Sequence, residues 1–162
     1  MNDDVIGEIM GHCSWETHIT FRMVSKKYNR CPRLRRRLKD APWEFICVEY
    51  ILPEEMLREY QDYVNWYYLS SYQKLSEGFI REFHDLVNWQ SLSRAKIMSE
   101  NLIRDFQERL DWYWVSLFQP LTVSMIEEFE NLIVWDHFQD NDSVPWEVRK
   151  HYIALHNSPA LS

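Results

Sequence analysis

Five tryptophans lie 23 residues apart in this chain, and this spacing limits the possible folds more than any other feature. They are Trp43, Trp66, Trp89, Trp112 and Trp135. A fixed period of about 20 to 50 residues is typical of proteins built from stacked structural repeats, in which each unit buries its apolar face against the next. The sequence therefore predicts about four or five stacked units between residues 43 and 156.

Other apolar positions repeat with the same period. Three residues after each tryptophan stand Ile46, Leu69, Leu92, Val115 and Phe138. Nine residues after it stand Leu52, Leu75, Met98, Leu121 and Val144. Seventeen residues after it stand Tyr60, Phe83, Phe106, Phe129 and Tyr152. This agreement indicates that every unit builds its core from the same positions, with the tryptophan as a wedge between units. We therefore expect Trp89→Ala to cost roughly 3 to 5 kcal/mol, as other large-to-small core changes do.

Each unit is expected to contain two helices, because residues that favour a helix start recur twice per period. The first start carries Ser76, Ser99 and Thr122, with Pro53 and Pro145 in the same column. The second start carries Asn65, Asn88 and Asp111, each directly before a tryptophan. The spacing of apolar residues from Phe79 to Val87 predicts about three turns for the first helix. One continuous helix per unit is the alternative, and the prolines at 53, 120 and 145 count against it.

The predicted fold is all-α, with a small helical module over 1–42, an α-solenoid of helix pairs over 43–156 and a tail over 157–162. The last helix is expected to seal the stack. Arg149 occupies the column that is isoleucine at 80, 103 and 126, and terminal repeats commonly turn polar where no neighbour follows.

The first 42 residues do not follow the period and carry two apolar stripes at helical spacing instead. The stripes are Val5, Ile6, Ile9 and Met10, then Phe21, Val24 and Tyr28. With the pattern Val-Ser-Lys-x-aromatic over 24–28, the segment resembles an F-box, although it lacks the Leu-Pro that usually precedes the first F-box helix. The resemblance implies a three-helix module that docks Skp1, the adaptor of cullin-based ubiquitin ligases, through Val5, Ile6, Ile9, Met10, Val24 and Tyr28. The same stripes could instead pack on the first repeat and cap the solenoid.

The wording of the repeats, as in SEGFIREFHDLVNW over 76–89, is similar to short tryptophan-containing helical repeats in proteins of large DNA viruses of amoebae. That resemblance implies a product that acts inside an infected host cell, in the cytoplasm or nucleus. The acidic start of the chain is unlike a secretory signal, and no apolar run approaches the roughly 20 residues of a membrane helix. We therefore expect an intracellular protein that is neither secreted nor membrane-spanning.

Motifs of known catalytic and cofactor sites are missing from the sequence. It contains no Gly-rich phosphate loop, no HExxH, no CxxC and no nucleophile elbow. The cluster His12, Cys13, His18 and Cys31 has no common zinc-ligand spacing, and the aspartates of 136–142 lack the glycine and glutamate of a calcium loop. We expect no catalytic residues, no cofactor and no metal, and hence no enzyme.

A protein partner is expected on positions that stacking leaves free. Aromatic pairs follow the tryptophan in alternate units, and we predict that Tyr67, Tyr113 and Trp114 bind a partner. Phe45 and Tyr68 are expected to cover a neighbouring unit, and packing in a dimer is the alternative for all these rings. The resulting function is an adaptor that offers Skp1 its first module and a target its repeats. The rival is a structural or scaffold repeat protein, viral and oligomeric, whose first module only caps the stack.

Nucleic-acid binding is not expected. Residues 41–162 hold nine Lys/Arg against twenty Asp/Glu, a net charge of −11 that repels phosphate backbones. Only the basic run of Arg33, Arg35, Arg36, Arg37 and Lys39 could attract one.

Overall fold

The computed structural model describes Thr17, residues 38–95 and residues 97–157. These residues form ten helices joined by turns, and no strand occurs among them. The predicted all-α solenoid of helix pairs is thereby confirmed. The chain divides into two compact units, residues 1–74 and residues 75–162. The F-box-like residues Val5, Ile6, Ile9, Met10, Val24 and Tyr28 lie outside the described residues.

In the first unit, three helices belong to the repeats. They are α4 (Trp43–Glu49), α5 (Glu54–Glu59) and α6 (Trp66–Tyr72). The two helices that begin with tryptophan, α4 and α6, pack against each other. Ile46, Leu57 and Leu69 contribute one fully buried side chain from each helix, so the core of this unit uses the predicted columns.

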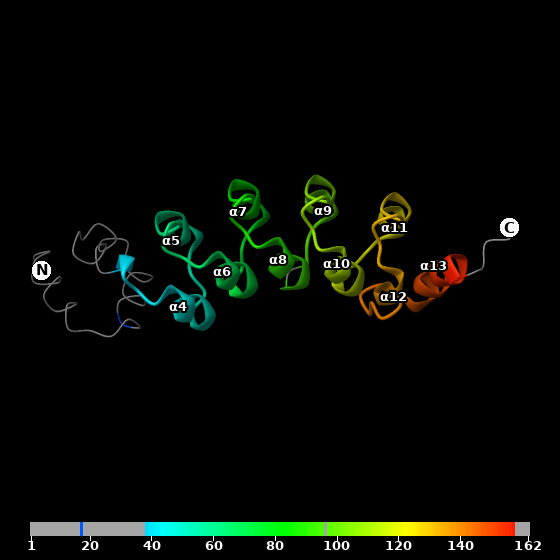
Figure 1. The fold of residues 1–162 in the computed structure, drawn as a ribbon, viewed down its shortest axis with the longest axis horizontal. Helices are drawn as coiled ribbons and strands as arrows, with labels where there is room; N and C mark the ends of the chain where they lie inside the picture. The colour runs from blue at the N-terminus through cyan, green and yellow to red at the C-terminus, as the bar shows by residue number, and fades with distance from the viewer. Residues whose placement is uncertain (1–16, 18–37, 96, 158–162) are drawn as a thin grey trace, which may run out of the picture. The chain divides into compact units, whose positions relative to one another are not determined.

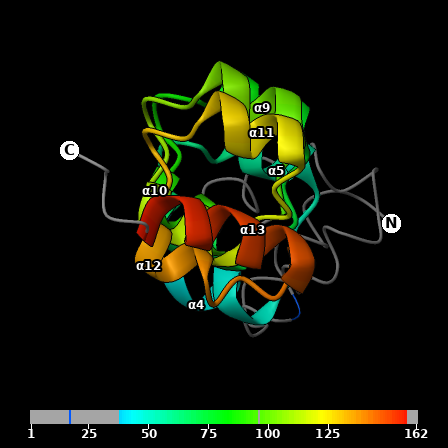
Figure 2. The same ribbon diagram turned by 90° about the vertical axis from the view of Figure 1, so that its right-hand side faces the viewer.

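The second unit continues the pattern with seven helices in its described residues. They are α7 (Glu77–Glu82), α8 (Trp89–Ala95), α9 (Glu100–Asp105), α10 (Trp112–Phe118), α11 (Val123–Glu128), α12 (Trp135–Phe138) and α13 (Trp146–Asn157). Figures 1 and 2 show α7, α9 and α11 in one row and α8, α10 and α12 in a second row. Helix α10 packs against both α8 and α12, and α13 packs against α12.

The predicted helix starts are confirmed by their hydrogen bonds. The hydroxyls of Ser76, Ser99 and Thr122 accept from backbone N–H groups three residues later, at 3.1, 3.2 and 3.4 Å. Before α6 and α10, the side chains of Asn65 and Asp111 accept from the N–H two residues later, and before α8 that of Asn88 accepts from the N–H three residues later. Each bond satisfies one of the free N–H groups of a first turn, which stabilises the start of the helix at that residue.

The predicted three-turn length of the first helix is wrong for α5, α7, α9 and α11, each of which has six residues. All four end at the aromatic column, where the backbone leaves the helical region. The end residues are Tyr60, Phe83, Phe106 and Phe129, with φ between −108° and −123° and ψ between 21° and 29°. A separate turn follows, closed at Phe83 by N–H donation from Leu86 and Val87.

For α5, α7 and α9, the tryptophan that follows the helix accounts for this early end. The indole N–H of Trp89 donates to the carbonyl of His84 at 2.9 Å, and that of Trp112 donates to Gln107 at 2.9 Å. Trp66 makes the same bond to Gln61 at 3.2 Å. The indole therefore takes a carbonyl that a longer helix would have used. In α13 the position 23 residues after Trp135 is a serine, and this helix runs unbroken for 12 residues.

Four of the indole rings, those of Trp43, Trp89, Trp112 and Trp135, also pack on the aromatic residue 17 positions later. Ring centroids lie 5.1 Å apart for Trp43 and Tyr60, and 4.7 Å apart for Trp89 and Phe106. The tryptophan thus joins the turn before it to the unit after it, in agreement with the prediction that it packs between successive units. Its burial differs from the expectation, however. Trp43 is buried, whereas Trp66, Trp89, Trp112 and Trp135 are only partly buried, because their outer edges reach the surface.

Buried amide side chains close the connections between units. Gln73 donates to the carbonyls of Cys47 and Tyr50 and accepts from the N–H of Leu52. Gln119, 46 residues later, donates to Ser93 and accepts from Met98. These bonds satisfy the free carbonyls at the end of a tryptophan helix and an N–H in the connection after it, groups that would otherwise be buried without partners.

Candidate interaction surface

Two of the described helices, α6 and α10, carry aromatic side chains at the same three positions of the repeat. Helix α6 carries Tyr67, Tyr68 and Tyr72, and α10 carries Tyr113, Trp114 and Phe118, one, two and six residues after the tryptophan. Tyr67 is 54% exposed, Tyr72 51%, Tyr113 40% and Phe118 42%. We call these two sets the α6 face and the α10 face.

Stacking of the repeats does not require aromatic residues at these positions. Helix α8, which stands next to α10 in the same row, carries Gln90, Ser91 and Ala95 there and still packs against α10. Apolar area that is exposed to water without a need of the fold commonly marks an interaction site. Because aromatic side chains are also the commonest anchors of protein interfaces, the two faces are the strongest candidates for a binding surface in the described chain.

The rings of each face support one another. On α10, Tyr113 meets Trp114 edge-on at 4.6 Å, and Trp114 lies parallel to Phe118 at 5.6 Å. On α6, Tyr67 meets Tyr68 edge-on at 5.4 Å, and Tyr68 lies nearly parallel to Tyr72. Rings held in this way lose little conformational freedom on binding, which lowers the entropy cost of an interface.

Two side chains from neighbouring helices border the α10 face. The guanidinium of Arg94, from α8, lies over the Trp114 ring at 5.0 Å. The imidazole of His137, from α12, lies 4.0 Å from the Tyr113 ring. The result is a continuous strip across three helices, with a cation on the α8 side.

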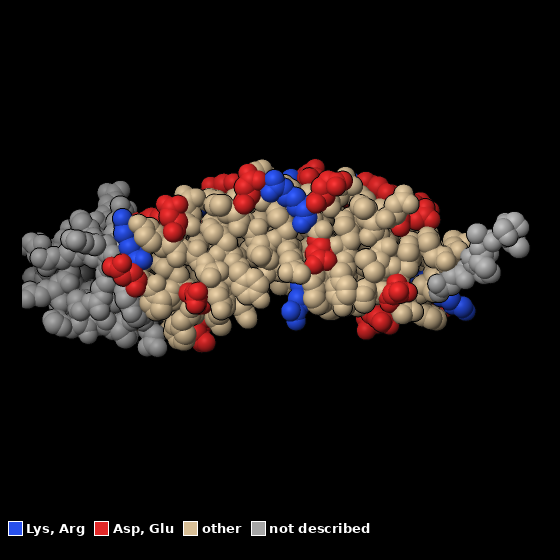
Figure 3. All heavy atoms as spheres, in the orientation of Figure 1, with Lys and Arg blue, Asp and Glu red and all other residues tan. Residues whose placement is uncertain are grey.

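The row of α7, α9 and α11 has a different character. Figure 3 shows acidic side chains gathered over this row with basic groups among them. Arg104 pairs with Glu100 and Glu128, and its pKa is raised chiefly by the hydrogen bond to Glu128. Arg81 pairs in the same way with Asp105 of the next unit. These exposed pairs form a solvated charged face, and its excess of carboxylates disfavours phosphate backbones.

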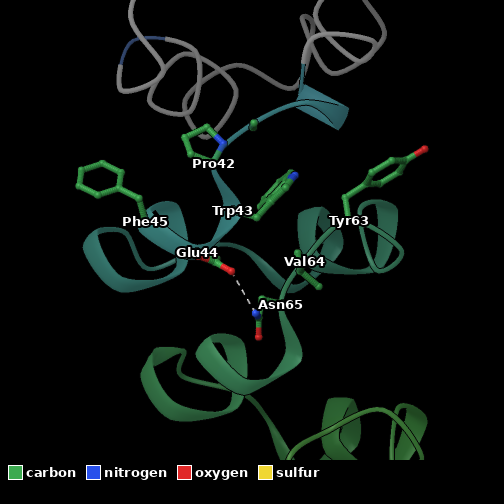
Figure 4. A pocket seen from close by; sticks show the side chains of 8 residues that line it. Pro42, Trp43, Glu44, Phe45, Tyr63, Val64 and Asn65 are labelled. Carbon is green, nitrogen blue, oxygen red and sulfur yellow. Dashed lines mark hydrogen bonds between the residues drawn. The ribbon is translucent and has the colours of Figure 1, made fainter.

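An open hollow of about 570 Å³ lies in the first unit (Figure 4). Trp43 and Val64 contribute apolar surface to it, with Phe45 and Tyr63 also in its lining. Its one carboxylate, Glu44, accepts a hydrogen bond from Asn65 at 3.3 Å. The hollow offers room for an apolar side chain. Its lining holds no paired nucleophile and base.

The predicted partner residues are found as follows. Tyr67 and Tyr113 are exposed, and Trp114 is partly buried against Phe118 and Arg94. Phe45, expected to cover a neighbouring unit, is 49% exposed, whereas Tyr68 is partly buried. The prediction missed Tyr72 and Phe118, although both are aromatic in the same alternate units, and this repetition could have revealed them.

The other predictions concern the basic run, metal ligands and a membrane-spanning helix. Lys39 is exposed, with its ammonium 5.5 Å from the centroid of the Tyr63 ring, while Arg33, Arg35, Arg36 and Arg37 lie outside the described residues. The cluster of His12, Cys13, His18 and Cys31 lies outside them too. Within residues 38–95 and 97–157, no three His, Cys, Asp or Glu side chains converge as metal ligands would. None of the helices described is long and apolar enough to span a bilayer.

Comparison of the chain with models of protein families, with curated proteins and with solved structures found no match. The functional reading therefore depends on the geometry of the surface and on the sequence patterns alone.

Proposed function

We propose that the chain is a protein–protein interaction adaptor whose repeats bind a target through exposed aromatic side chains. The observation that carries this proposal is the recurrence of three aromatic positions on α6 and α10, where the intervening α8 has Gln90, Ser91 and Ala95. Four of the six rings are exposed, all six contact a neighbouring ring of their own face, and the stack forms without aromatic residues at α8. Binding of a protein partner would explain why aromatic residues occupy these positions on α6 and α10.

The other half of the adaptor is the F-box-like segment, which would dock Skp1 and bring the target to ubiquitin ligation. This half is supported by the sequence resemblance of residues 2–43 and by the two apolar stripes within them. A role inside an infected host cell rests likewise on the wording of the repeats. In the rival function, a structural scaffold, the same stripes pack on the first repeat and no Skp1 binds.

Co-purification with Skp1 separates these two functions. The intact chain is compared with an Ile9→Glu, Val24→Glu double variant, and helicity is followed by circular dichroism. Association that is lost in a variant of unchanged helicity supports the adaptor. An intact chain that does not associate with Skp1, and a variant that unfolds, would reject the adaptor in favour of a capped scaffold.

The target surface is tested independently with a photo-crosslinking amino acid. Position 67, on the α6 face, is compared with position 55, an exposed site on α5 in the same unit. We expect discrete adducts with a protein from host cells at position 67 and none at position 55. Equal adducts at both positions, or none at either, would contradict a target-binding α6 face.

A further inference from the structure

We infer that α4 and the α6 face form one continuous surface, and that this surface binds an amphipathic helix with lysine or arginine beside its apolar side. We call it the α4–α6 surface: Phe45 and Val48 of α4 with Tyr67, Tyr68 and Tyr72 of α6. The inference rests on the proposed function, since it takes the rings of α6 as a protein-binding surface. It adds a second helix to that surface and names the chemistry of the partner.

Helix α4 exposes two apolar side chains that the stack does not bury. Phe45 is 49% exposed and Val48 is 42% exposed. They stand two and five residues after Trp43, at the positions that Ser91 and Arg94 occupy in α8. Because α8 stacks with polar residues there, the fold does not require apolar ones on α4. Apolar area exposed in this way is typical of an interaction site.

Helices α4 and α6 pack against each other in the same way as α8 and α10. Hydrogen bonds that join the first two helices and their ends recur 46 residues later in the second two. The linked residues are Glu44 with Asn65 and Cys47 with Gln73 in the first pair, and Gln90 with Asp111 and Ser93 with Gln119 in the second. In the second pair, Arg94 lies over the Trp114 ring. The corresponding residues of the first pair are Val48 and Tyr68, so the exposed side chains of α4 continue the α6 face.

Carboxylates border this surface on the α4 side. Glu44 and Glu49 are exposed, and they occupy the positions of α4 that tyrosines occupy in α6. No ion pair of Glu49 is found among residues 38–95 and 97–157. Residues 41–73 hold six Asp/Glu against one Lys/Arg, a net charge of −5, and that one base, Arg58, already pairs on its own helix. The surface is therefore apolar with an acidic border that is not neutralised.

A helix is the form of partner that this surface fits. The described residues contain no strand whose edge could pair with an extended segment. A bound segment must then satisfy its own backbone N–H and C=O groups, as a helix does. Apolar side chains at helical spacing on such a helix would lie on Val48 and on the rings of α6, as in other complexes that hold a helix in a groove.

The acidic border requires basic residues beside the apolar side of that helix. Lysine or arginine there would pair with Glu44 and Glu49, and these pairs favour a basic partner over an acidic one. A second copy of the chain would bring an equally acidic border to the surface. The chain's own basic run over 33–39 has two leucines, and one of them, Leu38, is already buried. That run is too poor in apolar side chains to cover the surface.

Selection from a displayed peptide library on the full-length chain tests the chemistry of the partner. Each peptide is a helix with leucine at positions i, i+3, i+4 and i+7, and the residues flanking this stripe vary between lysine and glutamate. We expect lysine to exceed glutamate at least about tenfold in the selected peptides. A Glu44→Lys, Glu49→Lys double variant should reverse the preference. Both side chains are exposed, so the helicity of this variant, measured by circular dichroism, should be unchanged.

A matched pair of variants locates the binding surface, with the affinity of the best selected peptide measured by fluorescence anisotropy at about 0.15 M salt. The double variant Phe45→Ser, Val48→Arg gives α4 the residues that α8 carries at these positions, which the stack accepts. It should weaken binding at least about tenfold, because two apolar anchors are lost and a cation faces a basic peptide. Tyr113→Ser on the α10 face should leave the affinity unchanged.

Three results would overturn the inference. The first is a selection that yields no peptide, or peptides in which lysine and glutamate are equally frequent. The second is a selected peptide whose affinity does not respond to the Phe45→Ser, Val48→Arg variant, since it then binds elsewhere. The third is a wild-type dimer, measured by light scattering, that the same variant dissociates, since the surface then belongs to a second copy.

These outcomes are distinct from those of crosslinking at position 67. A chain that crosslinks a host protein there, but selects peptides without a preference for lysine, refutes the basic partner alone. A chain that selects lysine-flanked peptides, but forms no crosslink at position 67 in host cells, refutes the host target alone.

Discussion

Replacement of Trp89 by alanine tests whether the indole contacts hold successive repeats together. The ring of Trp89 is partly buried and lies 4.7 Å from that of Phe106, and its N–H donates to the His84 carbonyl. A fully buried tryptophan costs about 3 to 5 kcal/mol when truncated, and partial burial reduces this to about 2. The hydrogen bond adds about 1 kcal/mol. We therefore expect a loss of about 3 kcal/mol, at the lower end of the expectation from sequence.

Two variants divide this loss into its parts. Trp89→Phe keeps a ring against Phe106 but removes the N–H donor, and should cost about 1 kcal/mol. Trp114→Ala removes the same residue type from the α10 face, where the ring contacts surface groups and its N–H has no partner among the described residues. It should also cost only about 1 kcal/mol, since those contacts are exposed.

Urea unfolding followed by circular dichroism and by fluorescence provides the measurement, with free energies compared where the two transitions coincide. A loss of about 3 kcal/mol corresponds to a fall in Tm of roughly 6 to 12 °C for a chain of this size. If Trp89→Ala is no more destabilising than Trp114→Ala, the tryptophan does not join the units, and the explanation of the early helix ends fails with it.

Two further predictions concern buried groups. Gln119→Met leaves the Met98 N–H and the Ser93 carbonyl without this partner, and should cost about 2 to 3 kcal/mol. The same change at exposed Gln139 should cost less than about 0.5 kcal/mol. Equal effects in urea unfolding would contradict a role of the buried Gln119 amide in closing the connection between units. Burial raises the pKa of the Cys47 thiol from 9.0 to about 11, so at pH 8 it is almost wholly protonated. In a variant with serine at both other cysteines, Cys47 should react with a thiol reagent far more slowly in folded than in urea-unfolded chain; equal rates would show that it is not shielded.

Much of the fold could be predicted because the signals that set it are local. A helix start depends on a side chain that bonds an N–H two or three residues away, and the caps at Asn65, Ser76 and Ser99 were therefore recognisable. The apolar columns were recognisable because each unit repeats them. Leu69, Ile80 and Leu92 are indeed buried.

Part of the binding surface was also predictable, since a residue that varies between units is one that the stack does not need. This reasoning identified Tyr67 and Tyr113 as exposed rings. The expectation that Phe45 covers a neighbouring unit or packs in a dimer is not decided by its half-exposed position on α4.

By itself, the sequence determined the period, the number of helices per unit, their starts and the columns that form the core. Only the tertiary structure decided where the first helices end, because Trp89 reaches His84 while its ring is held by Phe106 of the next unit. It also decided the partners of Gln119, whose bonds span 21 and 26 residues, and the position of Arg94 over the Trp114 ring of the next repeat. These features depend on the distance and rotation between successive units. Such quantities arise only when the units pack, and no local pattern of residues encodes them.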